Sequence, residues 1–372
     1  MRTSAVAGIV LANVNDNLLK KLTAHRSMAS IPIGARYRLI DFSLSNLVNA
    51  GVTSVGIITK ENYRSLMDHV GSGAAWELDR KNGGIYLLPP YLTSGVKRYS
   101  GTVDALYGAK DYLKRCDSEY IVLCNADVLA NLDINSAVKA HIEKKADVTV
   151  LYYKGTLTEE NRDNLHMTLG EDNQISIMRF ENTPNENTVC GIGVTIISRE
   201  LLLKFLEEAY EDGLVNFNRD FLSTKVDSLK IYGYEHKGYV CFMNGTDSYY
   251  KASMDMLKPE VRKELFNRER PIFTKTRDDM PTRYGTKSNV KNCLIADGCI
   301  IEGTVKNSII SRGVTIEKDA VVENCILMQE TVVGKGAQLN NVISDKNAVI
   351  GAEMILKGTK EKHFFVKKNQ IV

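Results

Sequence analysis

The fold is decided by the stretch Ala5-Val-Ala-Gly-Ile-Val-Leu-Ala12, which is followed by the loop Asn13-Val-Asn-Asp16. An unbroken run of small apolar residues near the N-terminus predicts the first, fully buried strand of a parallel α/β sheet. Ligands bind to such sheets just beyond the carboxyl end of this strand. A loop that holds phosphate there needs glycines, whose N–H groups can turn inward, and a cation. This loop has neither, so the sequence predicts a nucleotide-type architecture without its phosphate-binding chemistry.

Strand-like runs alternate with helical patterns through the first 250 residues. We expect strands over 5–12, 54–59, 120–124 and 148–153, and helices over 42–50, 103–115 and 134–144. This alternation predicts a doubly wound, Rossmann-like α/β domain over residues 1–257, with right-handed crossovers. Charged residues interrupted by Pro259, Pro271 and Pro281 then predict a linker over 258–291.

Apolar residues after this linker recur every six positions. One column consists of Val314, Ala320, Ile326 and Val332, and a second of Ile310, Ile316, Val322 and Met328. The expected corners lie near Gly298, Gly303, Gly313, Gly334 and Gly336. A six-residue period is typical of a left-handed parallel β-helix whose triangular coils have three short sides, which we predict over 292–372. The alternative is a β-sandwich with fortuitous spacing.

The composition excludes several classes of protein. A net charge of +3, with Lys and Arg spread along the chain, gives no sign of a nucleic-acid surface. No apolar run approaches the roughly 20 residues of a membrane span, and no signal-peptide pattern is present, so we expect a cytoplasmic protein without membrane contact. Seven cysteines without a CxxC spacing predict mostly buried free thiols.

Four motifs carry a resemblance to a known family. They are Arg38-Leu-Ile-Asp41-Phe-Ser-Leu-Ser-Asn46, Tyr99-Ser-Gly101-Thr102-Val-Asp104-Ala, Asn125-Ala-Asp127 and Gly245-Thr246-Asp-Ser-Tyr-Tyr. With them, the chain resembles the bacterial glucose-1-phosphate adenylyltransferases of glycogen biosynthesis over essentially its whole length. The resemblance implies a nucleotidyltransferase domain followed by a hexapeptide β-helix. It also implies a reaction of ATP with glucose 1-phosphate to give ADP-glucose, assisted by Mg²⁺.

The loop after the first strand departs from the family pattern. Alignment on Arg38 places the family's loop glycines at Asn13, Val14 and Asp16, its arginine at Leu18 and its Lys-Pro-Ala lysine at Met28. A β-branched valine adopts a positive φ only at a cost, and an aspartate adds negative charge where a triphosphate would lie. Leucine and methionine side chains supply no hydrogen-bond donor. The resemblance therefore implies a nucleotide loop that has lost its ligand.

The metal and sugar sites of the family are also changed. The first metal-binding aspartate corresponds to Asp127, but the second corresponds to Met243. A thioether does not replace a carboxylate as a ligand for a hard cation. The family's Glu-Lys-Pro element for the sugar phosphate falls at Asn182-Thr183-Pro184. A carboxylate and an ammonium group are therefore both missing.

These combined losses favour the GlgD-type subunit of the family, a catalytically degenerate partner that modulates a catalytic homologue in a tetramer. Such a subunit requires no cofactor, and Mg²⁺ matters only if residual activity exists. One alternative is an active glucose-1-phosphate adenylyltransferase with an unusual loop. The other is a hexapeptide acyltransferase, but no histidine for a general base lies between Val290 and Leu356.

The retained motif residues define a vestigial site. The resemblance assigns Tyr99, Gly101, Thr102 and Asp104 to nucleotide binding and Asp127 to a metal, although these residue types more often have scaffold or helix-capping roles. A weak nucleotide or sugar-phosphate ligand remains open.

Two pairs of residues near the N-terminus carry charge. Arg36 and Arg38 either meet an anionic effector or lie at an interface. His25-Arg26 has no carboxylate nearby in the sequence, which predicts a solvated helix end.

Overall fold

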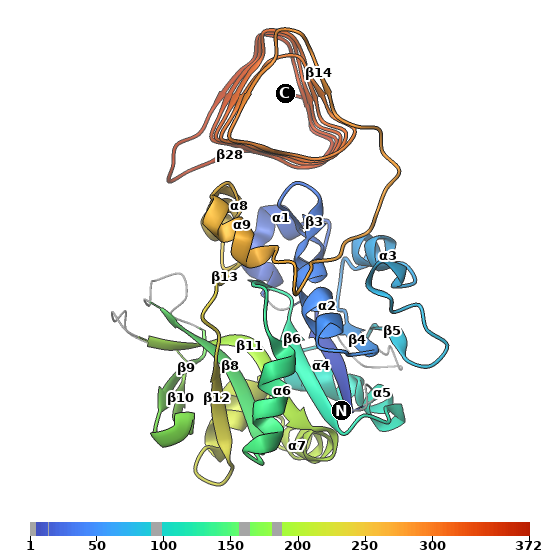
Figure 1. Ribbon diagram of the computed structural model, residues 1–372, viewed down its shortest axis with the longest axis vertical. Helices are drawn as coiled ribbons and strands as arrows, with labels where there is room; N and C mark the ends of the chain where they lie inside the picture. Colours follow the sequence, from blue (N-terminus) through green and yellow to red (C-terminus); the bar gives the residue numbers. More distant parts are fainter. Residues whose placement is uncertain (1–4, 14, 91–98, 156–163, 181–187) are drawn as a thin grey trace.

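The computed structural model of the chain describes residues 5–13, 15–90, 99–155, 164–180 and 188–372. Val14 and the segment Asn182-Thr183-Pro184, which carried part of the sequence argument, lie outside the described residues. The chain forms an α/β domain and a triangular β-helix that is stacked on it (Figure 1). Both predicted architectures are confirmed.

A nine-stranded mixed sheet forms the centre of the α/β domain. Its strands are β1 (Val6–Leu11), β4 (Ser54–Ile58), β5 (Gly84–Leu88), β6 (Tyr120–Asn125), β8 (Val148–Gly155), β9 (His166–Leu169), β10 (Ile175–Arg179), β11 (Thr188–Ser198) and β12 (Ile231–Glu235). Strands β6, β1, β4 and β5 are parallel neighbours, whereas β11 runs antiparallel to β6, β8 and β9. The carboxyl ends of β1 and β6 therefore lie side by side, which brings the loop after β1 close to Asp127.

Helices cover both faces of this sheet. They include α2 (Leu39–Asn49), α3 (Arg64–Val70), α4 (Thr102–Gly108), α5 (Lys110–Arg115), α6 (Ile134–Glu143) and α7 (Arg199–Glu211). The side chains of β1 alternate between the two faces of the sheet, and each face has its own core. Ile9 packs with α4 and α7, and Val10 packs with α2 and α6. A sheet that is apolar on both faces must be covered on both faces.

The predicted helix over 103–115 is interrupted. Helix α4 ends at Gly108, and α5 begins at Lys110. The ring of Tyr99 lies against Gly108, where an added Cβ would be 2.6 Å from the Tyr99 hydroxyl oxygen. The sequence pattern shows the periodicity of the two helices but not this close contact.

The β-helix consists of three five-stranded parallel sheets. The first contains β14 (Arg283–Tyr284), β17 (Ile300–Ile301), β20 (Thr315–Ile316), β23 (Val332–Val333) and β26 (Val349–Ile350). The second contains β15 (Asn289–Lys291), β18 (Thr304–Lys306), β21 (Val321–Glu323), β24 (Gln338–Asn340) and β27 (Ile355–Lys357). The third contains β16 (Leu294–Ile295), β19 (Ile309–Ile310), β22 (Ile326–Leu327), β25 (Val342–Ser344) and β28 (Phe364–Val366).

The six-residue columns hold only within a coil. Val332 pairs with Thr315 and Val349 pairs with Val332, so these coils take 17 residues rather than three times six, and the coil from Ile300 to Thr315 takes 15. Val314 and Ala320 accordingly point into the β-helix, whereas Ile326 lies in an apolar cluster shared with the α/β domain. The predicted six-residue period describes the spacing between neighbouring sides of one coil. It does not describe the spacing between equivalent positions in successive coils.

The segment 258–291, expected to be a linker, is partly ordered into elements. It contains α9 (Pro259–Leu265), which begins with Pro259 at the position where a missing N–H costs nothing. Its last part supplies β14 and β15, so the first coil begins at Arg283 rather than at residue 292. Only the stretch between Leu265 and Arg283 connects the domains without helix or strand.

An apolar cluster joins the two domains. The third sheet of the β-helix contributes the column Ile309, Ile326 and Ile343, which packs with Met256 and with Tyr249 of α8 (Thr246–Asp255). Figure 1 shows this side of the triangle resting on α1 (Lys20–Thr23), β3 (Tyr37–Arg38), α8 and α9. We call this contact region the domain interface.

Two sequence-based expectations concern thiols and membranes. The seven cysteines are free; Cys116, Cys241 and Cys293 are half-buried and the other four are buried. Among the described residues, no helix combines the length and the apolar character needed to cross a bilayer.

Candidate functional site

The loop after β1 is bound to Asp127. Asn15 adopts a left-handed conformation with φ of 61°, which asparagine tolerates better than most residues. Its Nδ2 atom donates a hydrogen bond to Asp127 Oδ2 at 2.7 Å. Asp127 follows β6 directly, so this bond connects the ends of two adjacent strands.

The rest of this loop is held by its own side chains. Asn13 Nδ2 donates to Asp16 Oδ2 at 2.6 Å, and Asn13 Oδ1 accepts from the N–H of Lys60 at 2.8 Å. The other carboxylate oxygen of Asp16 accepts from the N–H of Met28 at 2.8 Å. Polar side chains thus satisfy one another at positions where the family has glycines.

Asp127 is an unusual carboxylate. Its residue is only 3% exposed, and its Oδ1 has no hydrogen-bond partner from another described residue. Burial raises the pKa of Asp127 to about 6, a shift to which the nearby charge of Asp16 adds and which the Asn15 hydrogen bond opposes. No group of three or more His, Cys, Asp or Glu residues suited to a metal ion occurs in the described ranges.

Two methionines stand at positions where the resemblance implies polar residues. Met28 and Met243 are both 0% exposed and belong to the apolar cluster of the domain interface. The N–H of Met243 donates to the carbonyl of Asp127 at 2.8 Å, so its main chain lies beside Asp127 while its side chain packs in the core. Leu18, in contrast, is 48% exposed and contributes no polar group.

The residues assigned to nucleotide binding all have structural contacts. Tyr99 is a member of the core beneath α4. Gly101 lies against Val215, whose carbonyl oxygen would be 2.2 Å from an added Cβ. Thr102 Oγ1 accepts from the N–H of Phe217 at 2.8 Å, and Asp104 accepts hydrogen bonds from the main chain and side chain of Ser100. These contacts favour scaffold roles, and nucleotide binding by these residues stays a prediction.

The motif from Arg38 to Asn46 organises the domain around α2. Asp41 Oδ2 accepts from the N–H of Arg38 at 2.9 Å, and Asp41 Oδ1 lies 2.5 Å from His69 Nε2. Asn46 donates to the carbonyl of Ala130 and accepts from the N–H of Leu132, each at 3.0 Å. The motif therefore ties α2 to α3 and to the segment after β6.

Comparison with known proteins agrees with this architecture. Residues 7–260 match the family model described as nucleotidyl transferase, and residues 278–372 match the GlmU-like, C-terminal hexapeptide model. Glucose-1-phosphate adenylyltransferases from Bacillus mycoides (strain KBAB4), Bacillus cereus (strain Q1) and Bacillus anthracis are each 32% identical over 355 residues. These matches cover 94% of this chain and 92% of each relative. The chain belongs to the glucose-1-phosphate adenylyltransferase family.

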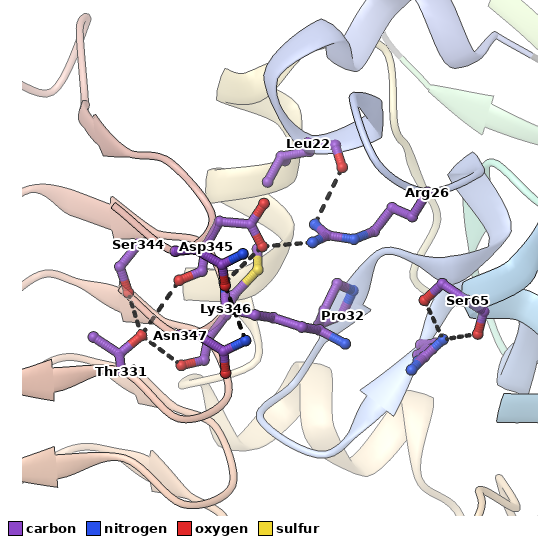
Figure 2. A network of polar contacts seen from close by, with 12 residues as sticks. Leu22, Arg26, Pro32, Ser65, Thr331, Ser344, Asp345, Lys346 and Asn347 are labelled. Atoms are coloured by element: carbon purple, nitrogen blue, oxygen red, sulfur yellow. Dashed lines mark hydrogen bonds and ion pairs between the residues drawn. The ribbon is translucent and has the colours of Figure 1, made fainter. Parts of the chain in front are cut away.

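A buried ion pair crosses the domain interface of this family member. Arg26 NH2 lies 2.6 Å from Asp345 Oδ1, and the side chains are 2% and 3% exposed. Arg26 also donates to the carbonyl of Leu22 (Figure 2). The expectation of a solvated helix end at His25-Arg26 was wrong for Arg26, because its carboxylate partner comes from the β-helix, 319 residues away in the sequence.

Further cations surround this ion pair. We define the cationic seam as the six residues Arg26, Arg36, Arg38, Arg277, Arg312 and Lys346. Burial, and then the charges of Arg38 and Arg26, lower the pKa of Lys346 to about 7. Burial likewise lowers the pKa of Arg312, with Arg36 and Arg277 adding to the shift. The seam therefore concentrates positive charge at the boundary between the two domains.

Among the described residues, five carboxylates act on the six cations of the seam: Asp41, Asp68, Asp279, Asp297 and Asp345. Asp345 binds Arg26, and Asp279 lies 4.0 Å from Arg312 Nε. The buried Nε atoms of Arg36 and Arg312 have no hydrogen-bond acceptor within the described part of the chain. Figure 2 shows Lys346 next to Asp345, with its side chain extending toward Pro32 of β2 (Pro32–Ile33). The Nε donors that lack a hydrogen-bond acceptor, and the small excess of cations over carboxylates, suit the seam to an anionic ligand.

Proposed function

We propose that this chain is a GlgD-type subunit of glucose-1-phosphate adenylyltransferase, which modulates a catalytic homologue and contributes little catalysis itself. One observation carries the proposal: Met28 and Met243 are fully buried in the core of the domain interface. At these positions the family resemblance expects a phosphate-binding lysine and a metal-binding aspartate. A methionine that is part of a core cannot act in place of either group.

The size of the expected loss supports this proposal. Phosphoryl and nucleotidyl transfer depend on positioning and on neutralising the charge of the phosphates. Each charged transition-state contact contributes on the order of 3 kcal/mol. Losing the lysine, the arginine and one metal ligand together would remove most of the rate enhancement.

Modulation by such a subunit requires a preference for one state of the catalytic partner. A difference of about 1–3 kcal/mol between two interface arrangements changes an apparent substrate affinity roughly 5- to 150-fold. The cationic seam gives this chain a place where a nucleotide or sugar phosphate would act on the contact between its domains. We also propose that this chain and its catalytic homologue form a mixed tetramer in the cytoplasm.

The alternative is that the chain is itself an active glucose-1-phosphate adenylyltransferase. Purified chain, incubated with ATP, glucose 1-phosphate and Mg²⁺, should form ADP-glucose at a negligible rate. Added to the catalytic homologue of the same cell, it should shift that enzyme's saturation curves, compared with the homologue alone at equal total protein. A turnover of about 1 s⁻¹ or more by the isolated chain would overturn the proposal.

A further inference from the structure

We propose that Asn15 is an internal substitute for a divalent cation: its side-chain amide binds the Asp127 carboxylate and so anchors the loop after β1 to the end of β6. The inference rests on the family placement of Asp127 as a metal-binding position. It does not depend on whether the chain modulates a partner.

The geometry around Asp127 carries the proposal. The 2.7 Å bond from Asn15 Nδ2 to Asp127 Oδ2 joins two strand ends that are separated by 112 residues in the sequence. A buried carboxylate needs a positive or hydrogen-bonding partner, because its charge is otherwise poorly solvated. In this chain no described cationic side chain pairs with Asp127, and its nearest named charge is the like charge of Asp16. The amide of Asn15 is the partner that remains.

The surrounding oxygen atoms do not suit Mg²⁺. This ion requires a nearly octahedral set of oxygen ligands and usually takes carboxylates together with substrate phosphates. Asp127 Oδ2 is engaged by Asn15, and both carboxylate oxygens of Asp16 accept hydrogen bonds from Asn13 and Met28. Met243 offers a buried thioether instead of the second carboxylate. The residues present therefore do not fit the metal of the family.

Hydrogen bonds anchor the described residues of the loop on both sides of Val14. Asn13 connects the loop to Lys60 after β4, Asp16 connects it to Met28, and Asn15 connects it to Asp127 after β6. In addition, Thr23 Oγ1 donates to the carbonyl of Asp16 at 2.7 Å. Each anchor lies in a different segment, so protein atoms hold Asn13, Asn15 and Asp16 in place.

Asn15→Asp is the decisive variant, because aspartate has nearly the same shape and also tolerates the left-handed region. It replaces the donor by a second carboxylate facing Asp127, and two such carboxylates need a shared proton or a cation. With Mn²⁺ as the probe, we expect this variant to bind one ion at least roughly tenfold more tightly than the parent chain. Its melting temperature should rise with Mn²⁺, while that of the parent chain should not.

Two controls make the result specific. Asn17→Asp adds the same charge to the same loop at an exposed residue and should bind no Mn²⁺. Asn15→Asp combined with Asp127→Asn should lose the site. Binding is followed by the electron paramagnetic resonance signal of free Mn²⁺, without substrates or a partner, so the outcome is independent of the proposed modulation.

Three outcomes would overturn the inference. They are Mn²⁺ binding at Asp127 in the parent chain, equal binding by Asn15→Asp and Asn17→Asp, and binding that survives the change at Asp127. If Asn15→Asp does not fold, Asn15→Gly replaces it, since glycine adopts the same φ freely. The Asn15→Gly variant should bind Mn²⁺ more tightly than the parent chain. An unchanged Mn²⁺ affinity would overturn the inference that Asn15 takes the place of the cation.

Discussion

The loop after β1 and the cationic seam are two charged regions that differ in how their charged groups are paired. In the loop, Asn13, Asn15 and Asp16 form hydrogen bonds with neighbouring segments, and Asp127 receives an amide. In the seam, Arg26 is paired, whereas the Nε atoms of Arg36 and Arg312 have no acceptor in the described residues. The contrast is between a buried carboxylate that accepts a hydrogen bond from a protein amide and a buried cation cluster in which two Nε donors lack an acceptor among the described residues.

Both regions contain a buried ionisable group that lowers the free energy of unfolding, and stability measurements can detect this effect. Asp127 is a buried carboxylate with a raised pKa, and Lys346 is a lysine with a lowered pKa. Each shift means that folding places the charged form in a less favourable environment than water does. If the comparison is correct, the loop should gain stability when its charge is removed, and the seam should respond to an added anion.

The largest effect is expected at the ion pair of the seam. Asp345→Ala leaves Arg26 buried beside Arg38 and Lys346 without a carboxylate, which should lower the free energy of unfolding by about 3 kcal/mol or more. Urea denaturation measures this change. The control is Glu235→Gln, which breaks the more exposed Lys154–Glu235 pair and should cost less than about 1 kcal/mol. Equal effects of the two changes would mean that Asp345 has no special role.

The second effect concerns the loop. The folded pKa of Asp127 is about 6, above the unfolded value of about 3.9, so the folded state retains this proton more strongly. Wild-type stability from this group is therefore greatest below about pH 4 and is lost as the pH rises through about 6. Asp127→Asn keeps the acceptor for Asn15 and should stabilise the fold by up to about 3 kcal/mol at pH 7.5. The gain should disappear near pH 4, as thermal unfolding across this range would show; a gain that did not change with pH would contradict the assignment.

Much of this fold is predictable from local sequence patterns. The apolar run that becomes β1, the amphipathic segment that becomes α6 and the short-period repeat each determine an element through their own side chains. Family motifs add Asp127 and the two methionine positions. These patterns depend only on which residue types are present and on the spacing between them.

The remaining features depend on contacts between distant segments. The pairing of Arg26 with Asp345 spans 319 residues, and that of Asn15 with Asp127 spans 112. No local pattern links such residues, which is why a solvated helix end was expected at Arg26. The 17-residue coil is likewise set by strand register, and it determines that Ile326 faces the α/β domain. The sequence patterns therefore predict neither of these two long-range contacts.

The smallest expected effect is the proton linkage of the seam. Because burial and the charges of Arg38 and Arg26 lower the pKa of Lys346 to about 7, this lysine is mostly neutral at pH 7.5. An anion bound in the seam would raise that pKa again, so binding of inorganic sulfate, which does not itself titrate near this pH, should take up a fraction of a proton, roughly one half. Calorimetry in buffers of different ionisation enthalpy measures the uptake, and Lys346→Met should abolish it while Lys335→Met, a change outside the seam, should not. Sulfate binding with no proton uptake, or with uptake that persists in Lys346→Met, would show that the ligand binds elsewhere and that the seam charges are balanced by the protein alone.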